Sequence, residues 1–128
     1  MKFSYVKFDD KYLPIVPLIV KGKVEAEINA FVDSGAGVSV FNFDTAEMIG
    51  IEAENGKKEF VKIGDGSFIE IFVHTLEIRF AGKSFKAKIG FSRGLGVGFN
   101  IMGRMDIFEN FIVSFNEKEK CIEFTELD

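Results

Sequence analysis

Short apolar runs separated by closely spaced turn residues constrain this chain more than any other feature. Glycine, asparagine, serine and aspartate interrupt the sequence at positions 9–10, 22, 34–37, 50, 55–56, 64–66, 82, 94–98 and 116. Within several of the intervening runs, apolar and charged residues alternate, as in EIRF (77–80) and KAKI (86–89). Short alternating runs at this spacing predict a closed or folded all-β domain.

The same pattern predicts where the strands lie. Phenylalanine, which favours strands, occurs 16 times. We expect strands at 2–8, 15–20, 23–33, 38–41, 59–63, 67–80, 84–91, 99–102, 111–115 and 120–124.

Two segments have helical character instead. In 42–50 (NFDTAEMIG), Asp44 or Thr45 is the expected N-cap and Gly50 the expected C-terminal stop. In 103–111 (GRMDIFENF), apolar residues recur at helical spacing. Both helices are short, so the residues alone predict a small β-barrel or β-sandwich with one or two helical turns.

Composition excludes several classes of partner. The chain has 128 residues, the size of one domain. Its formal net charge is −4 with both signs interspersed, so it lacks the basic face that a nucleic acid requires, and nothing favours an anionic membrane surface. One histidine and one cysteine leave no internal disulfide and no multi-histidine metal site. We expect no metal, no cofactor, no nucleic acid and no membrane partner.

The longest apolar run, LPIVPLIV (13–20), bears on the compartment. Its eight residues are far fewer than the about 20 that a spanning helix needs. It contains both prolines of the chain and lacks a small-residue cleavage site, so a strand is a better interpretation than a signal peptide. We therefore expect a soluble, cytoplasmic protein.

One aspartate stands between an apolar strand and the smallest residues of the chain. In INAFVDSGAGVSVF (28–41), Asp33 ends the strand and Ser34, Gly35 and Ala36 follow. Asp-Ser-Gly is also a common turn sequence, because Asp and Ser bond to nearby backbone and Gly accepts a positive φ. The apolar residues on both sides, however, indicate that the loop returns to the core, which predicts a desolvated carboxylate.

A second segment, FNIMGRMDIFENFIVSF (99–115), joins an apolar strand to Gly-Arg and a short amphipathic stretch. Together the two segments resemble the retropepsin-like aspartic proteases, the family of the retroviral proteases and their cellular and microbial relatives. The family's first signature, an apolar pair followed by Asp-Thr/Ser-Gly-Ala and then a serine, is matched by FVDSGAGVS (31–39). Its second signature, an apolar pair followed by Gly-Arg-Asn/Asp and a hydrophobic helix, is matched by IMGRMDIF (101–108). The resemblance covers most of the chain. It implies one retropepsin-like aspartic protease domain over 1–128, a closed barrel of the acid protease type with a flap hairpin.

The resemblance also assigns roles around the first motif. Asp33 is implied to be the catalytic aspartate, and Ser34, Gly35 and Ala36 the active-site loop. Ser34 takes the place usually held by threonine, whose hydroxyl makes hydrogen bonds across the dimer centre.

Around the second motif, Met102 and Gly103 are implied to support the active-site loop, and Arg104 to hold the base of the dimer. Met105 replaces the polar residue commonly found after this arginine, which departs from the family's pattern.

Between the motifs, EFVKIGDGSFIEIFV (59–73) is the candidate flap, the hairpin that closes over substrate in this family. Two alternating arms flank a turn with an Asp-Gly signal. An ordinary surface hairpin is the alternative, but a glycine-rich tip suits a flap. The expected substrate-binding residues are Ile63, Gly64, Asp65, Gly66 and Ser67.

The catalytic chemistry requires two carboxylates, and the motif occurs once. One carboxylate accepts a proton from the attacking water and the other donates to the scissile carbonyl oxygen, so the two share one proton. An active enzyme is therefore expected to be a homodimer with one Asp33 from each chain. The strand at 2–8 and the hairpin at 111–124 are both candidates for the interface, and the sequence does not choose between them.

Three further features have ordinary interpretations. His74 lies mid-strand and is expected to be a satisfied strand residue, since no nucleophile motif accompanies it. The glycine-rich stretch 94–98 lacks a phosphate-loop ending, which leaves a plain connection or a loop at the substrate cleft. Cys121 is expected to serve packing or an interface.

The resulting functional prediction is a homodimeric aspartic endopeptidase acting on peptide or protein substrates. A non-catalytic dimer of the same fold that binds peptide or protein segments is one alternative, and a monomer in which Asp33 is only a turn residue is another. The residues of the flap and of FSRGLGVGF (91–99) predict a cleft lined by Phe, Ile and Val that accepts apolar side chains beside the scissile bond.

Overall fold

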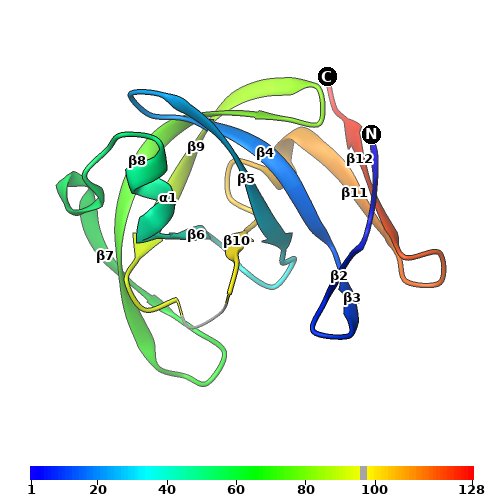
Figure 1. Ribbon diagram of the computed structural model, residues 1–128, viewed down its shortest axis with the longest axis horizontal. Helices are drawn as coiled ribbons and strands as arrows, with labels where there is room; N and C mark the ends of the chain where they lie inside the picture. Colours follow the sequence, from blue (N-terminus) through cyan, green and yellow to red (C-terminus); the bar gives the residue numbers. More distant parts are fainter. Residues whose placement is uncertain (96–97) are drawn as a thin grey trace.

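The computed structural model describes residues 1–95 and 98–128, and its secondary structure is mainly β-strand (Figure 1). The strands are β1 (Lys2–Ser4), β2 (Val6–Phe8), β3 (Lys11–Leu13), β4 (Ile15–Lys21), β5 (Glu25–Val32), β6 (Ser39–Asn42), β7 (Lys57–Lys62), β8 (Phe68–Phe80), β9 (Lys83–Ser92), β10 (Asn100–Met102), β11 (Phe111–Asn116) and β12 (Cys121–Glu126). The helical elements are α1 (Phe43–Met48) and the 3-10 helices η1 (Ala53–Asn55) and η2 (Phe108–Asn110). The expected mainly β class is confirmed.

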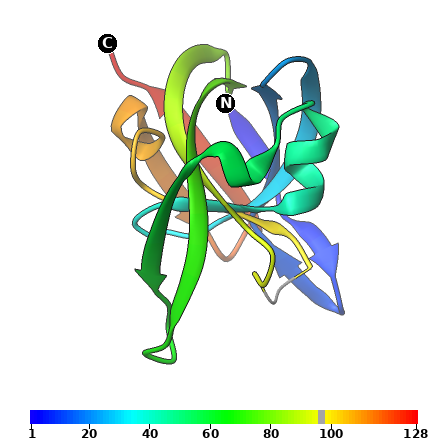
Figure 2. The ribbon, with the colours of Figure 1, turned by 90° about the vertical axis from the view of Figure 1, so that its left-hand side faces the viewer.

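Seven strands form one strongly curved sheet in the order β4-β5-β10-β6-β9-β8-β7 (Figure 2). β4 also pairs with β8, with Val20 opposite Ile78, so the sheet closes on itself. β10 runs parallel to β5 and antiparallel to β6, and therefore lies between the strands on either side of the Asp33 loop. This insertion brings the two sequence motifs together.

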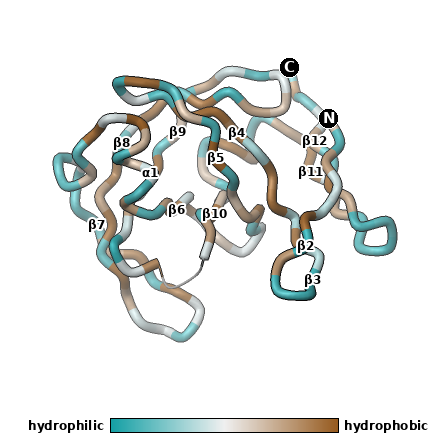
Figure 3. The backbone as a smooth tube through the Cα atoms, in the orientation of Figure 1, coloured by the Kyte–Doolittle hydropathy of each residue, from teal (hydrophilic) through white to brown (hydrophobic). Residues whose placement is uncertain are grey.

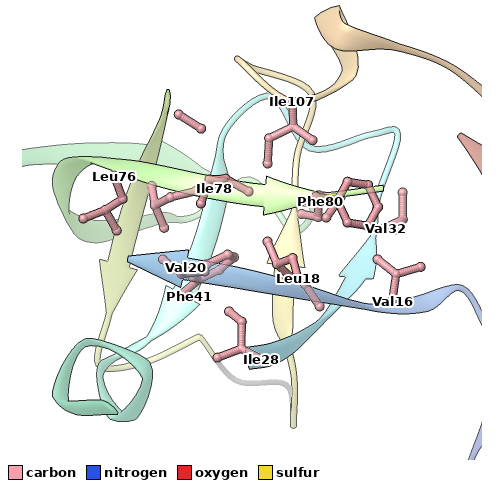
Figure 4. Close-up of a cluster of buried hydrophobic side chains, with 14 of the residues drawn as sticks. Val16, Leu18, Val20, Ile28, Val32, Phe41, Leu76, Ile78, Phe80 and Ile107 are labelled. Atoms are coloured by element: carbon pink, nitrogen blue, oxygen red, sulfur yellow. The ribbon is translucent and has the colours of Figure 1, made fainter. Parts of the chain in front are cut away.

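The interior of the ring is filled by alternate residues of its long strands. Val16, Leu18 and Val20 of β4 and Leu76, Ile78 and Phe80 of β8 belong to one cluster of buried side chains (Figure 4). β4 is largely hydrophobic, whereas the turn between β11 and β12 is hydrophilic (Figure 3). Burial of this apolar surface is the main term that stabilises the fold.

The two ends of the chain meet in a second sheet, with the order β1-β12-β11. β1 is antiparallel to β12, and the N-terminal amino group donates a hydrogen bond to the carbonyl oxygen of Phe124. Both chain ends consequently lie on the same side of the molecule (Figure 1). A separate hairpin, β2–β3, follows β1.

The expected strand at 2–8 is divided in the structure. At Tyr5 the side chain is buried and the backbone N–H bonds to the carbonyl of Lys120, so β1 and β2 belong to different sheets. β3 was not expected from the sequence, because it has only three residues and its turn is made by Asp9 and Asp10 at φ 48° and 61°.

The helical predictions are correct in place but not in detail. Neither Asp44 nor Thr45 caps α1: the N-cap is Asn42, which makes no side-chain capping bond, and Thr45 is buried inside the helix. Gly50 follows the helix at φ 73°, a conformation that suits a C-terminal stop. The second expected helix is a turn followed by the 3-10 helix η2. No helix among the described residues has the length and apolarity to cross a membrane.

Candidate active site

Asp33 directly follows β5 and begins a loop that leads to β6. Its backbone N–H donates to the carbonyl of Met102 at 3.0 Å, so the ladder between β5 and β10 extends to the candidate catalytic residue. Its carbonyl accepts from the N–H of Ala36 at 3.1 Å, which closes the turn. The position of Asp33 is thus fixed by backbone bonds on both sides.

The carboxylate is held by the loop itself. The N–H of Gly35 donates to Oδ1 of Asp33 at 2.9 Å, and a Cβ added at Gly35 would lie 3.2 Å from the same oxygen. Asp33 is half-buried in the single chain, so the expected desolvated carboxylate is not found there. The reason is that the loop opens into a surface cleft, and Ser34 and Gly35 are exposed.

The second motif packs directly against this loop. The N–H groups of Arg104 and Met105 donate to the carbonyls of Ala36 and Gly37 at 2.9 and 2.8 Å. Met102 is fully buried beside β5, opposite Val32. The side chains of Arg104 and Met105 remain exposed.

Gly103 of the second motif lies directly against the backbone of the first motif. A Cβ at this position would lie 2.6 Å from the carbonyl carbon and oxygen of Val38, which is shorter than any real contact. Its N–H donates to Oγ of Ser39 at 2.9 Å, inside the protein. Only glycine fits here, because the obstacle is backbone.

A buried polar network, which the sequence did not indicate, anchors β10. Asn100 is 7% exposed, and its Oδ1 accepts the N–H of Asn42 at 2.8 Å. Its Nδ2 donates to Oγ1 of Thr45 at 3.1 Å and approaches the carbonyl of Asn29 at 3.4 Å. Asn100 thereby ties together β5, β10 and the start of α1. An asparagine between Phe99 and Ile101 was the available signal, since a buried amide requires partners.

The candidate flap is the hairpin of β7 and β8. Its arms pair from Lys57–Val73 to Lys62–Phe68 and extend away from the main body of the sheet (Figure 2). Ile63 and Ser67 close the tip with a 2.9 Å backbone bond, and Gly66 has φ 88°. Gly64 and Asp65 complete the tip, and all five tip residues are exposed.

Asp65 orders this tip. Its Oδ1 accepts hydrogen bonds from the hydroxyl of Ser67 at 2.5 Å and from the N–H of Ser67 at 2.9 Å. These bonds, the side-chain bond first, lower the pKa of Asp65 below its ordinary value.

A cleft of about 330 Å³ lies between the Asp33 loop and this hairpin. Its lining residues from the loop and the neighbouring strands are Asp33, Gly35, Ala36, Gly37, Val38, Val40 and Ile101, and those from the hairpin are Val61, Lys62, Ile63, Gly64 and Ile69. Leu95, from the connection between β9 and β10, also lines the cleft. The lining is mainly aliphatic, in agreement with the expected apolar cleft. The expected phenylalanines are not part of the lining among the described residues. A hollow of about 410 Å³ beside Met1 and Phe80 contains neither Asp33 nor the hairpin tip.

The remaining candidates are His74, Cys121 and the glycine-rich stretch 94–98. Nε2 of His74 is 2.8 Å from the carbonyl oxygen of Ala53, so His74 is a satisfied strand residue. Cys121 is a partly buried free cysteine on β12. Of the glycine-rich stretch, Leu95 lines the cleft, whereas residues 96–97 lie outside the described part of the chain.

This chain is similar to known proteins in its structure but matches none of them at the level of family models or curated sequences. No protein-family model matches the chain, and no curated protein matches it. EIAV protease in complex with the inhibitor HBY-793 is similar with a TM-score of 0.59 and 20% identity, over 81% of this chain and 92% of that one. A retropepsin-like aspartic protease from Rickettsia conorii is similar with a TM-score of 0.69 and 16% identity, over 97% of this chain and 90% of that one. The chain therefore has the retropepsin-like fold that its two motifs predicted.

Proposed function

We propose that a homodimer of this chain is an aspartic endopeptidase, in which one Asp33 from each subunit activates water. The observation that carries the proposal is the position of Asp33: a half-buried carboxylate at the base of an aliphatic cleft, opposite a hairpin with an ordered tip. The solved structures most useful for comparison are proteases by name, which supports the same reaction class.

The proposed reaction uses the two carboxyls in different protonation states. Water adds to the peptide carbonyl carbon while its proton passes to the ionised carboxylate, and the protonated carboxyl donates to the carbonyl oxygen. The tetrahedral intermediate then breaks at the C–N bond. The carboxyl that took the proton from water donates it to the leaving amine, and the other carboxylate recovers a proton from a hydroxyl of the intermediate. A single chain supplies one carboxylate to this cleft, so the site is incomplete without a second copy.

The extended substrate would lie between the Asp33 loop and the β7–β8 hairpin. The aliphatic residues Val38, Val40, Val61, Ile69 and Ile101 favour apolar side chains next to the scissile bond. Gly35 and Gly37 leave room for the substrate backbone to approach the carboxylates.

Digestion of an unbiased peptide mixture tests this proposal, with mass spectrometry of the products across acid to neutral pH. We expect cleavage by the wild type and a loss of about 10²–10⁴-fold in Asp33→Asn, because the variant lacks the proton acceptor. Asp44→Asn, at an exposed aspartate of α1, is the matched control and should cleave normally. Equal cleavage by wild type and Asp33→Asn would rule out the mechanism, and peptide binding without cleavage by either would favour the non-catalytic alternative.

A further inference from the structure

The orientation of the β7–β8 hairpin over the cleft depends on the base of the hairpin. β8 pairs with β9 from Phe80 back to Phe72, and with β7 from Val73 to Phe68. In the described part of the chain, the two arms beyond Phe72 therefore pair only with each other. A two-stranded ribbon of this kind is marginally stable by itself. The contacts around residues 72–74, where the three strands meet, thus decide how the hairpin lies.

We propose that His74 is a positioning residue, whose side chain holds the segment that enters β7 and thereby sets the hairpin over the cleft that contains Asp33. His74 does not line this cleft among the described residues, so it acts through the hairpin and does not touch the substrate. The inference rests on the proposed function in one respect, because it takes this cleft as the substrate site.

The first contact of His74 is a hydrogen bond to η1. Nε2 of the ring lies 2.8 Å from the carbonyl oxygen of Ala53, the first residue of η1. Because a carbonyl oxygen only accepts, the bond requires a proton on Nε2. η1 ends at Asn55, and β7 begins two residues later at Lys57. The bond therefore fixes the chain immediately before the hairpin.

The second contact is the close approach of the His74 ring to Gly56. A Cβ added at Gly56 would lie 2.6 Å from both Cδ2 and Nε2 of the ring, and 2.7 Å from the carbonyl oxygen of Val73. Gly56 has φ −74° and ψ 171°, extended values that other residues adopt as well. Glycine is therefore required here by the contact with the ring and with β8, and not by its backbone conformation.

The core supports the His74 ring in turn. Phe91 is completely buried, and its ring meets the His74 ring edge to face with 5.6 Å between centroids. On the opposite face of β8, Ile71 packs over Gly90 of β9, where an added Cβ would lie 2.6 Å from Cδ1 of Ile71. The base of the hairpin is thus held on both faces, and His74 is the residue that connects the core to the segment before β7.

An ion pair also reaches η1, but it is the weaker anchor. Nη2 of Arg93 lies 2.8 Å from Oε1 of Glu54, and the two side chains are 58% and 62% exposed. Exposed pairs contribute little, because both charges remain in water and both side chains lose freedom. The His74 bond is partly buried and is attached to the core through Phe91, so we expect it to dominate.

Hydrogen exchange followed by NMR tests the anchor without a substrate. His74→Phe keeps a ring but removes the donor to Ala53. We expect the amides of residues 58–62 and 68–71 to exchange about tenfold faster, while those of 19–21 and 77–79, where β4 and β8 close the sheet, keep their rates. Thr75→Val, at the exposed next residue of β8, is the matched control and should change neither group. Unchanged exchange in the hairpin, or an equal increase in both groups, would overturn the proposal.

Two further variants separate the hydrogen bond from the contact of the ring. His74→Gln returns an amide donor at nearly the reach of Nε2, and should bring hairpin exchange back to within about threefold of the wild type. Gly56→Ala keeps the donor but forces η1 away from the ring, so it should speed hairpin exchange as His74→Phe does. Exchange in His74→Gln as fast as in His74→Phe would overturn the role of the bond, and unchanged exchange in Gly56→Ala would overturn that of the close contact.

Steady-state kinetics connects the anchor to the proposed reaction, with a peptide taken from the wild-type digest as substrate. His74→Phe should raise KM by about tenfold and change kcat by less than about threefold, because a loosened hairpin weakens the binding of substrate and transition state alike. An unchanged KM would remove the positioning role.

The exchange experiment does not depend on activity, so the two proposals fail separately. A wild type that cleaves no peptide, in a protein that shows the expected exchange pattern, would remove the endopeptidase and leave the anchor. Cleavage by the wild type, with unaltered hairpin exchange in His74→Phe, would remove the anchor and leave the endopeptidase.

Discussion

The backbone N–H of Gly103 donates a 2.9 Å hydrogen bond to the hydroxyl of Ser39, across 64 positions of sequence. Ser39 is completely buried, and Gly103 is buried as well. Each residue belongs to one of the two sequence motifs, so this bond adds a buried side-chain contact to the backbone bonds that hold the two motifs together.

Ser39→Ala should destabilise the protein by about 1–3 kcal/mol, because it leaves the buried N–H of Gly103 without a partner. Urea unfolding followed by circular dichroism measures the loss. Ser84→Ala, at an exposed position of β9, is the control and should change stability by less than about 0.5 kcal/mol. Equal effects of the two substitutions would contradict the assigned role of Ser39.

The sequence predicted the retropepsin-like fold and the residues of both motifs, because these depend on local chemistry. Asp33 and Gly103 each belong to a short pattern whose residue types are restricted by turns and close approach. The prediction that the Asp33 carboxylate is desolvated was wrong for the single chain, because its burial depends on what covers the cleft. The network around Asn100 was missed because its partners, Asn29, Asn42 and Thr45, come from distant segments.

The division of the N-terminal strand was missed for the same reason. Residues 2–8 alternate like one strand, yet Tyr5 bonds to Lys120 and Glu117, at the other end of the chain. Nothing in the local pattern specifies that contact. Long-range partners of this kind decide which edges of the terminal sheet remain free.

Gly103→Ala should prevent normal folding or cost more than about 2 kcal/mol, since the added methyl group would meet the backbone of Val38 at 2.6 Å. Gly37→Ala is the matched control in the same loop region, where an added Cβ meets nothing within 4 Å. Thermal unfolding of both variants measures the difference. A destabilised Gly37→Ala with an unaffected Gly103→Ala would show that the two segments do not pack as described.

The tip of the candidate flap should lose order in acid, at a pH set by Asp65. The hydrogen bonds from Ser67 lower the pKa of the Asp65 carboxyl in the folded protein. The contribution of these bonds to the order of the tip is therefore present above the ordinary pKa of about 3.9, and it is lost as the pH falls through the lowered pKa. Carboxyl-carbon NMR should show Asp65 titrating below about 3.9, and Ser67→Ala should move the midpoint upward. Ser84→Ala should leave it unchanged, and an Asp65 midpoint insensitive to Ser67→Ala would contradict the assigned bond.

Alkaline pH should loosen the terminal sheet through Tyr5. Burial, followed by the hydrogen bond to Glu117, raises the pKa of Tyr5 well above its ordinary value of about 10. The folded protein then holds this proton more tightly than the unfolded chain, so stability is retained below pH about 10 and declines as pH rises above it.

Tyr5→Phe should cost about 1 kcal/mol near neutral pH, from the lost hydrogen bond, and should reduce the decline in stability between pH about 9 and about 11. Denaturant midpoints at these pH values measure both effects, with Tyr12→Phe at an exposed tyrosine as the control. A Tyr5→Phe protein that loses as much stability in alkali as the wild type would show that other groups, such as the lysines, govern alkaline unfolding.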